Sequence, residues 1–221
     1  MSRQLAWSYS SLQAFETCPW RWKLTKWTKQ VTEPQTGATV EGNKVHKALE
    51  LHLKGTQALP VSYQHLLPLV ERIKASPGKI EAERKIALRA DFTECGYFDK
   101  DTWYRGVFDV RVLQPASATI LDWKTGKRKF DTDQLKLFAA TEFKLNPRAE
   151  EVHTGYVWLK ERKLDKESFT RDQAPEIWQE FAQRVGRMEH AIKTDNFPKR
   201  PSGLCREWCP VGQKLCEHCG A

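Results

Sequence analysis

Hydrophobic residues in the first third of the chain recur at the spacing of amphipathic helices. Ser8 and Ser10 are suitable N-caps for a helix that ends near Phe15, and Pro19 interrupts the pattern shortly afterwards. Further helices are predicted over residues 20–27, 40–54 and 62–76. This part of the chain is therefore expected to be helical.

From residue 79 the pattern changes to the period of two that is typical of strands. Residues 79–89 alternate loosely, and residues 102–113 are rich in aromatic and β-branched side chains. Additional strands are predicted at 118–124, 152–159 and 164–170, and helices at 131–145 and 175–193. This order predicts an α/β domain with a small sheet and one crossover helix.

Composition limits the class of protein. The 221 residues include 9 Trp, 10 Phe and 5 Tyr, which is too much aromatic surface for a disordered chain. No apolar run approaches the ~18 residues of a membrane span. No secretory hydrophobic region follows Met1, so a cytoplasmic location is expected.

The charge balance points to a polyanionic partner. There are 36 Lys and Arg residues against 28 Asp and Glu residues, which gives a formal charge of +8. Neutralising phosphates releases counterions, so a basic protein suits nucleic acid. Charge alone does not distinguish a protein that binds nucleic acid from a basic protein that does not.

Cysteines are concentrated at the C-terminal end of the chain. In a reducing compartment, clustered cysteines more often bind a metal than form disulfides. The four C-terminal cysteines could by themselves form a four-thiolate zinc site. The six cysteines are Cys18, Cys95, Cys205, Cys209, Cys216 and Cys219.

Two predicted strands carry the residues that suggest chemistry. Asp109 lies in the strand over 102–113, and Asp122 and Lys124 are two apart in the next strand, on one face. A hairpin about residues 114–117 would bring Asp109 near them. Two facing carboxylates suit a cation such as Mg²⁺ or Mn²⁺. The alternative is a cross-strand salt bridge between Asp and Lys on a solvated face.

Five short motifs occur in an order that resembles the RecB-like branch of the PD-(D/E)XK nuclease superfamily. They are Ser8–Pro19 (S-x-S-x-L-x-x-F-x-x-C-P), Gly42–His46 (G-x-x-x-H), Gly106–Asp109 (G-x-x-D), Asp122–Gly126 (D-x-K-T-G) and Gln134–Leu135. The resemblance includes CRISPR-associated RecB-like nucleases, AddB-type nuclease domains and small phage exonucleases. It implies a restriction-endonuclease-like core, with a small central mixed sheet flanked by helices.

The resemblance also implies roles for individual residues. Lys124 would orient or activate the hydrolytic water, and Gln134 would position Lys124 or the scissile strand. Glu83, on the strand before the site, matches the family more loosely, as does Glu81. The ligands implied for Mg²⁺ or Mn²⁺ are His46, Asp109, Asp122 and the carbonyl of Trp123.

In iron–sulfur members of the resembled branch, one N-terminal and three C-terminal cysteines hold a [4Fe–4S] cluster that joins the two ends of the domain. Cys219 could replace Cys216, structural Zn²⁺ is the alternative, and Cys95 lies apart. Three residues separate Cys205 from Cys209 and six separate Cys209 from Cys216, whereas two and five are more usual in the family. The implied ligands are Cys18, Cys205, Cys209 and Cys216.

Together these features predict one nuclease domain over residues 1–221. It would comprise a helical part (1–78), a catalytic sheet (79–172) and a C-terminal helix with the cysteine tail (173–221). The expected activity is metal-dependent hydrolysis at single-stranded or duplex DNA ends by an exonuclease, with endonuclease activity as a further option. Recombination, repair, phage genome processing or a CRISPR-type partner would fit, in a bacterial or phage-infected cell. The alternative is a non-catalytic nucleic-acid-binding or zinc-ribbon scaffold protein.

Overall fold

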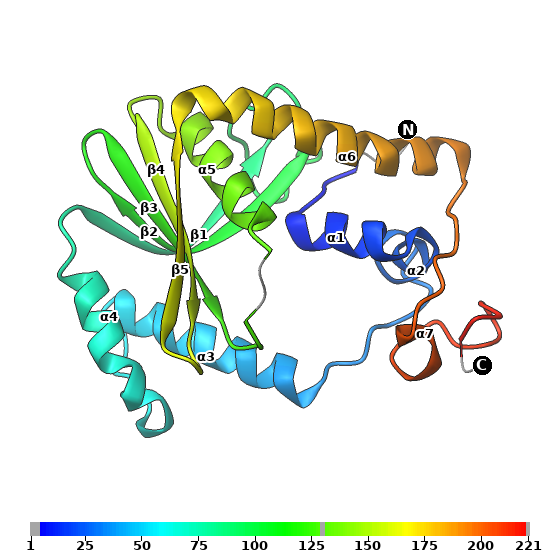
Figure 1. The fold of residues 1–221 in the computed structure, drawn as a ribbon, viewed down its shortest axis with the longest axis horizontal. Helices are drawn as coiled ribbons and strands as arrows, with labels where there is room; N and C mark the ends of the chain where they lie inside the picture. The colour runs from blue at the N-terminus through cyan, green and yellow to red at the C-terminus, as the bar shows by residue number, and fades with distance from the viewer. Residues whose placement is uncertain (1–4, 129–130, 220–221) are drawn as a thin grey trace. The chain divides into compact units, whose positions relative to one another are not determined.

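The computed structural model describes residues 5–128 and 131–219. The chain divides into two compact units, whose elements are labelled in Figure 1. We call Thr36–Gln179 the sheet unit, and Met1–Gln35 with Glu180–Ala221 the terminal unit. Their membership of one nuclease domain stays a prediction. Among the described residues, no helix combines the length and the hydrophobicity that crossing a membrane would require.

A five-stranded mixed sheet forms the centre of the sheet unit, with its strands in chain order. Neighbouring strands are antiparallel except β3 and β4, which are parallel and are connected through helix α5 (Asp133–Leu145). The strands are β1 (Lys79–Leu88), β2 (Tyr104–Leu113), β3 (Ser117–Lys124), β4 (Glu151–Trp158) and β5 (Lys163–Thr170). The predicted α/β fold with one crossover helix is confirmed.

Helices cover both faces of this sheet. On one face, α3 (Gly37–Leu53) and α4 (Leu67–Lys74) bury apolar residues in a core that contains Val110 and Trp123. The buried residues of α3 are Val45 and Leu49, which are four positions apart and therefore lie on one face of the helix. On the opposite face lies α5, most of whose residues are buried.

The terminal unit joins residues from the two ends of the chain. Helix α1 (Tyr9–Thr17) begins after Ser8, whose side chain accepts a hydrogen bond from the Ser11 N–H, as the predicted N-cap requires. The guanidinium of Arg184, in α6 (Ala174–Thr194), donates to both oxygens of Glu16 at 2.8 and 2.7 Å. A short helix, α7 (Leu204–Glu207), follows in the C-terminal segment.

Two predicted helices are irregular in the structure. The stretch over residues 20–27 consists of α2 (Pro19–Trp22) and a π-helical turn, η1 (Lys23–Trp27). The stretch over residues 62–76 consists of a 3₁₀ turn, η2 (Val61–Leu66), followed by α4. The second break has a simple cause, because Pro68 has no N–H to donate and is tolerated only in the first turn of a helix.

A buried ion pair connects the sheet to α5. Arg111 of β2 donates to both carboxylate oxygens of Glu142 at 2.7 and 2.8 Å, and to Glu81 of β1 at 2.9 Å. The Glu142 side chain is fully buried. Burial raises the pKa of Glu142, and Arg111 opposes this rise. The fold therefore depends on this guanidinium to balance a carboxylate that water cannot reach.

Replacing the guanidinium should be costly. Arg111→Met leaves Glu142 buried without a cation, and we expect the free energy of unfolding to fall by about 3–5 kcal/mol in urea titrations. The double variant Arg111→Met/Glu142→Leu should recover most of that loss. Lys74→Met, which removes an exposed pair with Glu71, should cost less than about 1 kcal/mol. An Arg111→Met protein as stable as the parent would refute this role.

Candidate active site and metal centre

Three potential metal ligands meet beside the middle of strands β1 and β2. They are His46 of α3, Glu83 of β1 and Asp109 of β2, and one ligand atom from each lies within 4.8 Å of the others. His46 Nδ1 lies 3.4 Å from Asp109 Oδ2. An imidazole with two carboxylates is a donor set that suits Mn²⁺ and also accepts Mg²⁺. His46 and Asp109 are ligands that the resemblance implies, whereas Glu83 matches the family pattern only loosely.

Close backbone approach brings His46 to this position. Gly42 lies one turn before His46 on α3, and a Cβ atom at Gly42 would lie only 3.1 Å from Thr125 Oγ1. The glycine therefore lets α3 pack against the segment that follows β3. This contact gives a physical reason for the glycine of the G-x-x-x-H motif.

Glu83 reaches the site because its backbone departs from regular strand geometry. Its φ angle is +53°, in the left-handed region that non-glycine residues rarely adopt. Its neighbours Ala82 and Arg84 pair with Val110 and Phe108, which places Glu83 opposite Asp109. Strained backbone of this kind is commonly stored at functional sites. In a regular strand Glu81 and Glu83 would share a face, but here Glu81 contacts Arg111 and Glu83 joins His46.

A second group of side chains surrounds Lys124 of β3. Its ammonium lies 2.7 Å from Asp122 Oδ2, and it donates to Gln134 Oε1 at 2.9 Å. Gln134, in the first turn of α5, donates in turn to Asp122 Oδ1 at 3.2 Å. The ring of Tyr156 on β4 lies 4.7 Å from the ammonium. These contacts hold Lys124 in one place. Tyr156 was not among the residues expected from the sequence.

One backbone hydrogen bond connects the two groups. The N–H of Trp123, between Asp122 and Lys124, donates to Asp109 Oδ2 at 2.8 Å. The carboxylate of Asp109 is thereby fixed to β3, while the same oxygen faces His46. Asp122 is not one of the three clustered ligand residues, but its charge acts on His46. The structure thus brings the sequence candidates His46, Asp109, Asp122, Lys124 and Gln134 into one site.

Burial and like charges perturb the acids of this site. Burial, followed by the charge of Asp109, raises the pKa of Glu83. Burial also raises the pKa of Asp122 to about 6, against the effect of Lys124. Burial lowers the pKa of His46, but the hydrogen bond and charge of Asp109, with the charges of Asp122 and Glu83, together raise it above its usual value. Two like charges 4.8 Å apart repel by roughly 3 kcal/mol at an effective dielectric of about 20.

A match to a protein-family model shows which superfamily the chain belongs to. A family model described as the PD-(D/E)XK nuclease superfamily matches residues 6–217. The chain belongs to this superfamily. Comparison with curated protein sequences gives no match.

The chain is also similar to solved structures. A candidate exonuclease from Eubacterium rectale superposes with a TM-score of 0.56 at 12% identity, covering 92% of this chain and 86% of its own. A second structure, SSO0001, has a TM-score of 0.48 at 13% identity, covering 96% and 85% of the two chains. At 12% identity the first likeness concerns the fold alone. The TM-score of the second structure is too low to support any conclusion.

A divalent cation, which members of this nuclease superfamily use, fits the site. Asp122 Oδ2 is buried and accepts no hydrogen bond among the described residues, although the Lys124 ammonium lies close to it. The crowded acids and this incompletely satisfied oxygen are what an added positive charge would relieve. The residues placed to hold the ion are His46, Glu83 and Asp109.

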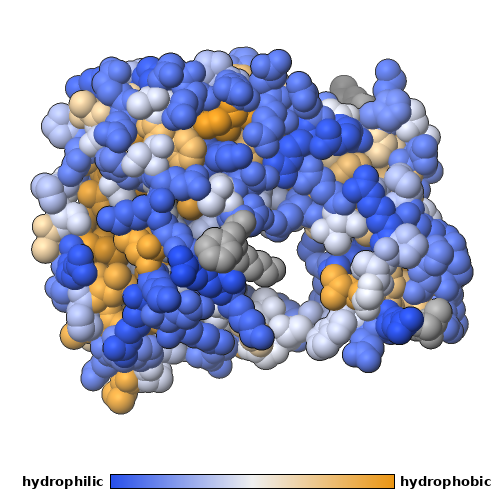
Figure 2. Space-filling model, viewed as in Figure 1, coloured by the Kyte–Doolittle hydropathy of each residue, from blue (hydrophilic) through white to orange (hydrophobic). Residues whose placement is uncertain are grey.

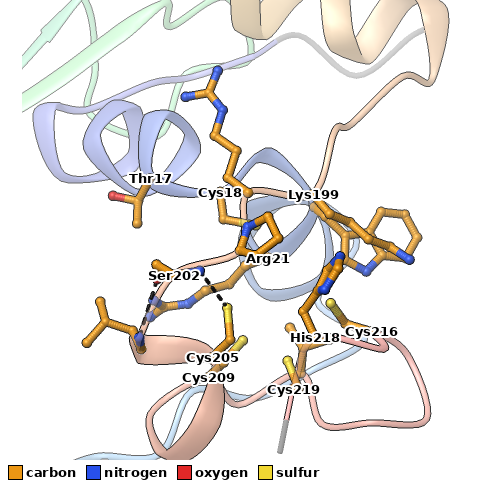
Figure 3. Close-up of a pocket in the computed structure, with 15 residues that line it drawn as sticks. Thr17, Cys18, Arg21, Lys199, Ser202, Cys205, Cys209, Cys216, His218 and Cys219 are labelled. Carbon is orange, nitrogen blue, oxygen red and sulfur yellow. Dashed lines mark hydrogen bonds between the residues drawn. The ribbon is translucent and has the colours of Figure 1, made fainter. Parts of the chain in front are cut away.

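Most cysteines of the chain lie around one pocket of the terminal unit. Cys18 and the four C-terminal cysteines line one small pocket, with His218 beside them (Figure 3). Burial, followed by the neighbouring Cys209 and Cys216, raises the pKa of Cys219 to about 12. Cys205 Sγ accepts a hydrogen bond from the Ser202 N–H. Cys95 belongs to the sheet unit, where its sulfur lies 3.6 Å from Thr102 Oγ1.

The raised pKa of Asp122 gives a prediction for the nuclease without metal. A group whose pKa rises from 3.8 to about 6 on folding stabilises the protein below pH 4 and loses that contribution as the pH rises through 6. In EDTA at pH 7.5, Asp122→Asn should therefore be more stable than the parent by at most roughly 3 kcal/mol. At pH 4 the difference should shrink toward zero.

Urea titration at both pH values measures this effect. Asp91→Asn is the control, because Asp91 is exposed and hydrogen bonds lower its pKa, so its removal should bring no gain at either pH. A loss of stability in Asp122→Asn at pH 7.5 would show that the buried charge is already balanced without a metal.

Proposed function

We propose that this superfamily member is a divalent-metal-dependent DNA nuclease that acts at DNA ends. The observation that carries the proposal is the convergence of His46, Glu83 and Asp109 beside the Asp122–Lys124 pair. Nucleic-acid binding without hydrolysis gives no reason to bury acids where phosphates must approach. The site can instead hold a cation against a phosphate and keep an ammonium next to the reacting atoms.

Each residue has a role that follows from its contacts. When bound, the cation would act as a Lewis acid and lower the pKa of a coordinated water. Lys124 orients the attacking water and stabilises the negative charge that develops on the phosphate oxygens. Gln134 positions Lys124 through its 2.9 Å hydrogen bond. Asp122 is proposed to complete the ligand set with the carbonyl of Trp123.

We propose exonuclease rather than endonuclease action. The E. rectale structure, named as a candidate exonuclease, supports this choice through the fold that it shares with the chain. The match of the family model over residues 6–217 supports the proposal that both units belong to one nuclease domain. Recombination, repair, phage genome processing or work with a CRISPR-type partner would all supply DNA ends.

We further propose that the cysteine pocket holds a structural [4Fe–4S] cluster through Cys18, Cys205, Cys209 and Cys216. The support is that five cysteines, from both ends of the chain, line the same pocket. Such a cluster would fasten these ends together within the terminal unit and take no part in hydrolysis. Cys219, which is buried beside Cys209 and Cys216, is the alternative to Cys216.

Substitutions at the active site test the nuclease. Asp122→Asn and Lys124→Ala should lower Mg²⁺- or Mn²⁺-dependent cleavage of linear DNA by at least about 100-fold, because each removes charge that acts on the transition state. Gel-shift affinity for the same DNA in EDTA should change little. Asp101→Asn and Lys100→Ala are matched controls at exposed positions and should cut normally.

The form of the substrate separates the remaining alternatives. An exonuclease degrades linear DNA from its ends and leaves covalently closed circles intact, whereas an endonuclease opens the circles. If both active-site variants cut as fast as the parent, the site assignment fails. If the parent binds DNA but cuts neither form with either metal, the chain is a binding or scaffold protein.

Anaerobic purification tests the cysteine pocket. The protein should be brown, with broad absorbance near about 400 nm and bound iron and sulfide. Cys209→Ser should lose the colour and lower the melting temperature, whereas Cys95→Ser, in the sheet unit, should keep the colour. A colourless protein that contains one equivalent of zinc would replace the iron–sulfur assignment with a zinc site.

A further inference from the structure

A groove in the sheet unit lies outside the nuclease site. It has a volume of about 520 Å³ and runs between helix α4 and strands β3 to β5. Its floor is aliphatic. In Figure 2, hydrophobic surface gathers at the left of the view between the strands and α4, with hydrophilic surface around it. The floor residues include Leu66, Leu69, Ile73, Leu121, Val157 and Leu159.

The groove lies on the opposite face of the sheet from the reacting groups. Leu121 lines the groove, and Asp122, the next residue of β3, points to the other face. The same alternation separates Val157 from Tyr156. A ligand in the groove would therefore leave Lys124 and its partners uncovered, so the groove is not a part of the substrate site.

The rim of the groove carries positive charge from two sides. The cations are Arg72 on the side of α4 and Arg162, Lys163 and Lys166 on the β4–β5 hairpin, and the imidazole of His65 also lines the groove on the side of α4. All five are exposed, and no acidic residue lines the groove. Within residues 5–128 and 131–219, no ion pair involves the side chain of Arg72, Arg162 or Lys166. The positive charge of the rim is thus available to an incoming ligand.

The lining distinguishes between classes of ligand. Single-stranded nucleic acid is held by aromatic side chains that stack on bases, and no aromatic residue lines this groove. A second copy of the chain would also carry a charge of +8, which opposes self-association at a basic rim. Aliphatic pockets between cationic walls match a peptide with large apolar side chains and several carboxylates.

We propose that this groove is a docking site for an acidic peptide segment of a partner protein. Its apolar side chains lie on the aliphatic floor, and its carboxylates pair with the cations of α4 and the β4–β5 hairpin. Leu164, which is 41% exposed at the groove, is part of the uncovered apolar surface. The docking would tether the nuclease to a partner while the active site remains open.

A synthetic peptide provides the probe. We would use a fluorescent 14-residue peptide that combines Asp and Glu with Leu, Ile and Phe, and measure its binding to the full-length protein by anisotropy in EDTA. Two control peptides change one property each, by replacing the acids with Asn and Gln or the apolar residues with Ala. We expect both control peptides to bind at least about tenfold more weakly, and the affinity for the acidic peptide to fall as salt is raised.

Variants locate the binding. Leu164→Asp and Lys166→Glu should each weaken the acidic peptide by at least about tenfold. Val61→Asp, at a position that is 85% exposed, and Lys160→Glu, on the same hairpin, do not line the groove and should change its affinity less than twofold. Hydrogen exchange should show protection over α4 and β5 when the peptide binds. Cleavage of linear DNA by Leu164→Asp should equal that of the parent.

Three results would overturn the proposal. One is the absence of peptide binding at any salt concentration, or equal binding by the groove variants. Another is displacement of the peptide by a single-stranded oligonucleotide with a parallel loss of DNA affinity in Lys166→Glu, which would make the groove a nucleic-acid surface. The third is a dimer in sedimentation that Leu164→Asp dissociates, which would make it a self-association face. None of these results depends on whether the protein cuts DNA.

Discussion

Repulsion between buried and half-buried carboxylates dominates the electrostatics of the candidate site. Ligand atoms of Glu83 and Asp109 lie within 4.8 Å of each other, and the charge of Asp109 also acts on the buried Asp122. A folded chain tolerates such crowding only when positive charge compensates for it. His46 and Lys124 supply part of that charge, and the geometry leaves room for a cation to supply the rest. The crowding of carboxylates makes the site costly to fold. The same crowding would attract a cation that can bind a phosphate.

The backbone brings these charges together by departing from regular geometry at two points. The left-handed Glu83 turns its side chain toward His46, away from Arg111, which contacts Glu81. The close packing at Gly42 brings α3 near the end of β3. Elsewhere the sheet is regular, and Arg111 balances the other buried acid, Glu142. The fold therefore separates a structural ion pair from a group of acids that could hold a metal ion.

Much of the fold and the site could be predicted from the sequence, because the spacing of hydrophobic residues and short motifs both reflect local structure. The strands, the crossover helix and the apolar stripe of α3 follow from alternation and helical spacing. The resemblance identified Lys124 and Gln134, which the structure joins by a hydrogen bond. Glu83 stayed a weak candidate, since alternation places it beside Glu81 and a positive φ angle leaves no signal in residue type. Tyr156 and the basic groove depend on pairing between distant strands and helices, which one sequence does not record.

The central claim is that a divalent cation sits between α3, β1 and β2. A crystal grown with Mn²⁺ and measured at the manganese absorption edge tests it most directly. The account predicts an anomalous peak in contact with His46, Glu83 and Asp109, and a weaker peak or none in Glu83→Gln. An ordered protein with no peak there at saturating Mn²⁺, or with the ion bound elsewhere in the sheet unit, would contradict it.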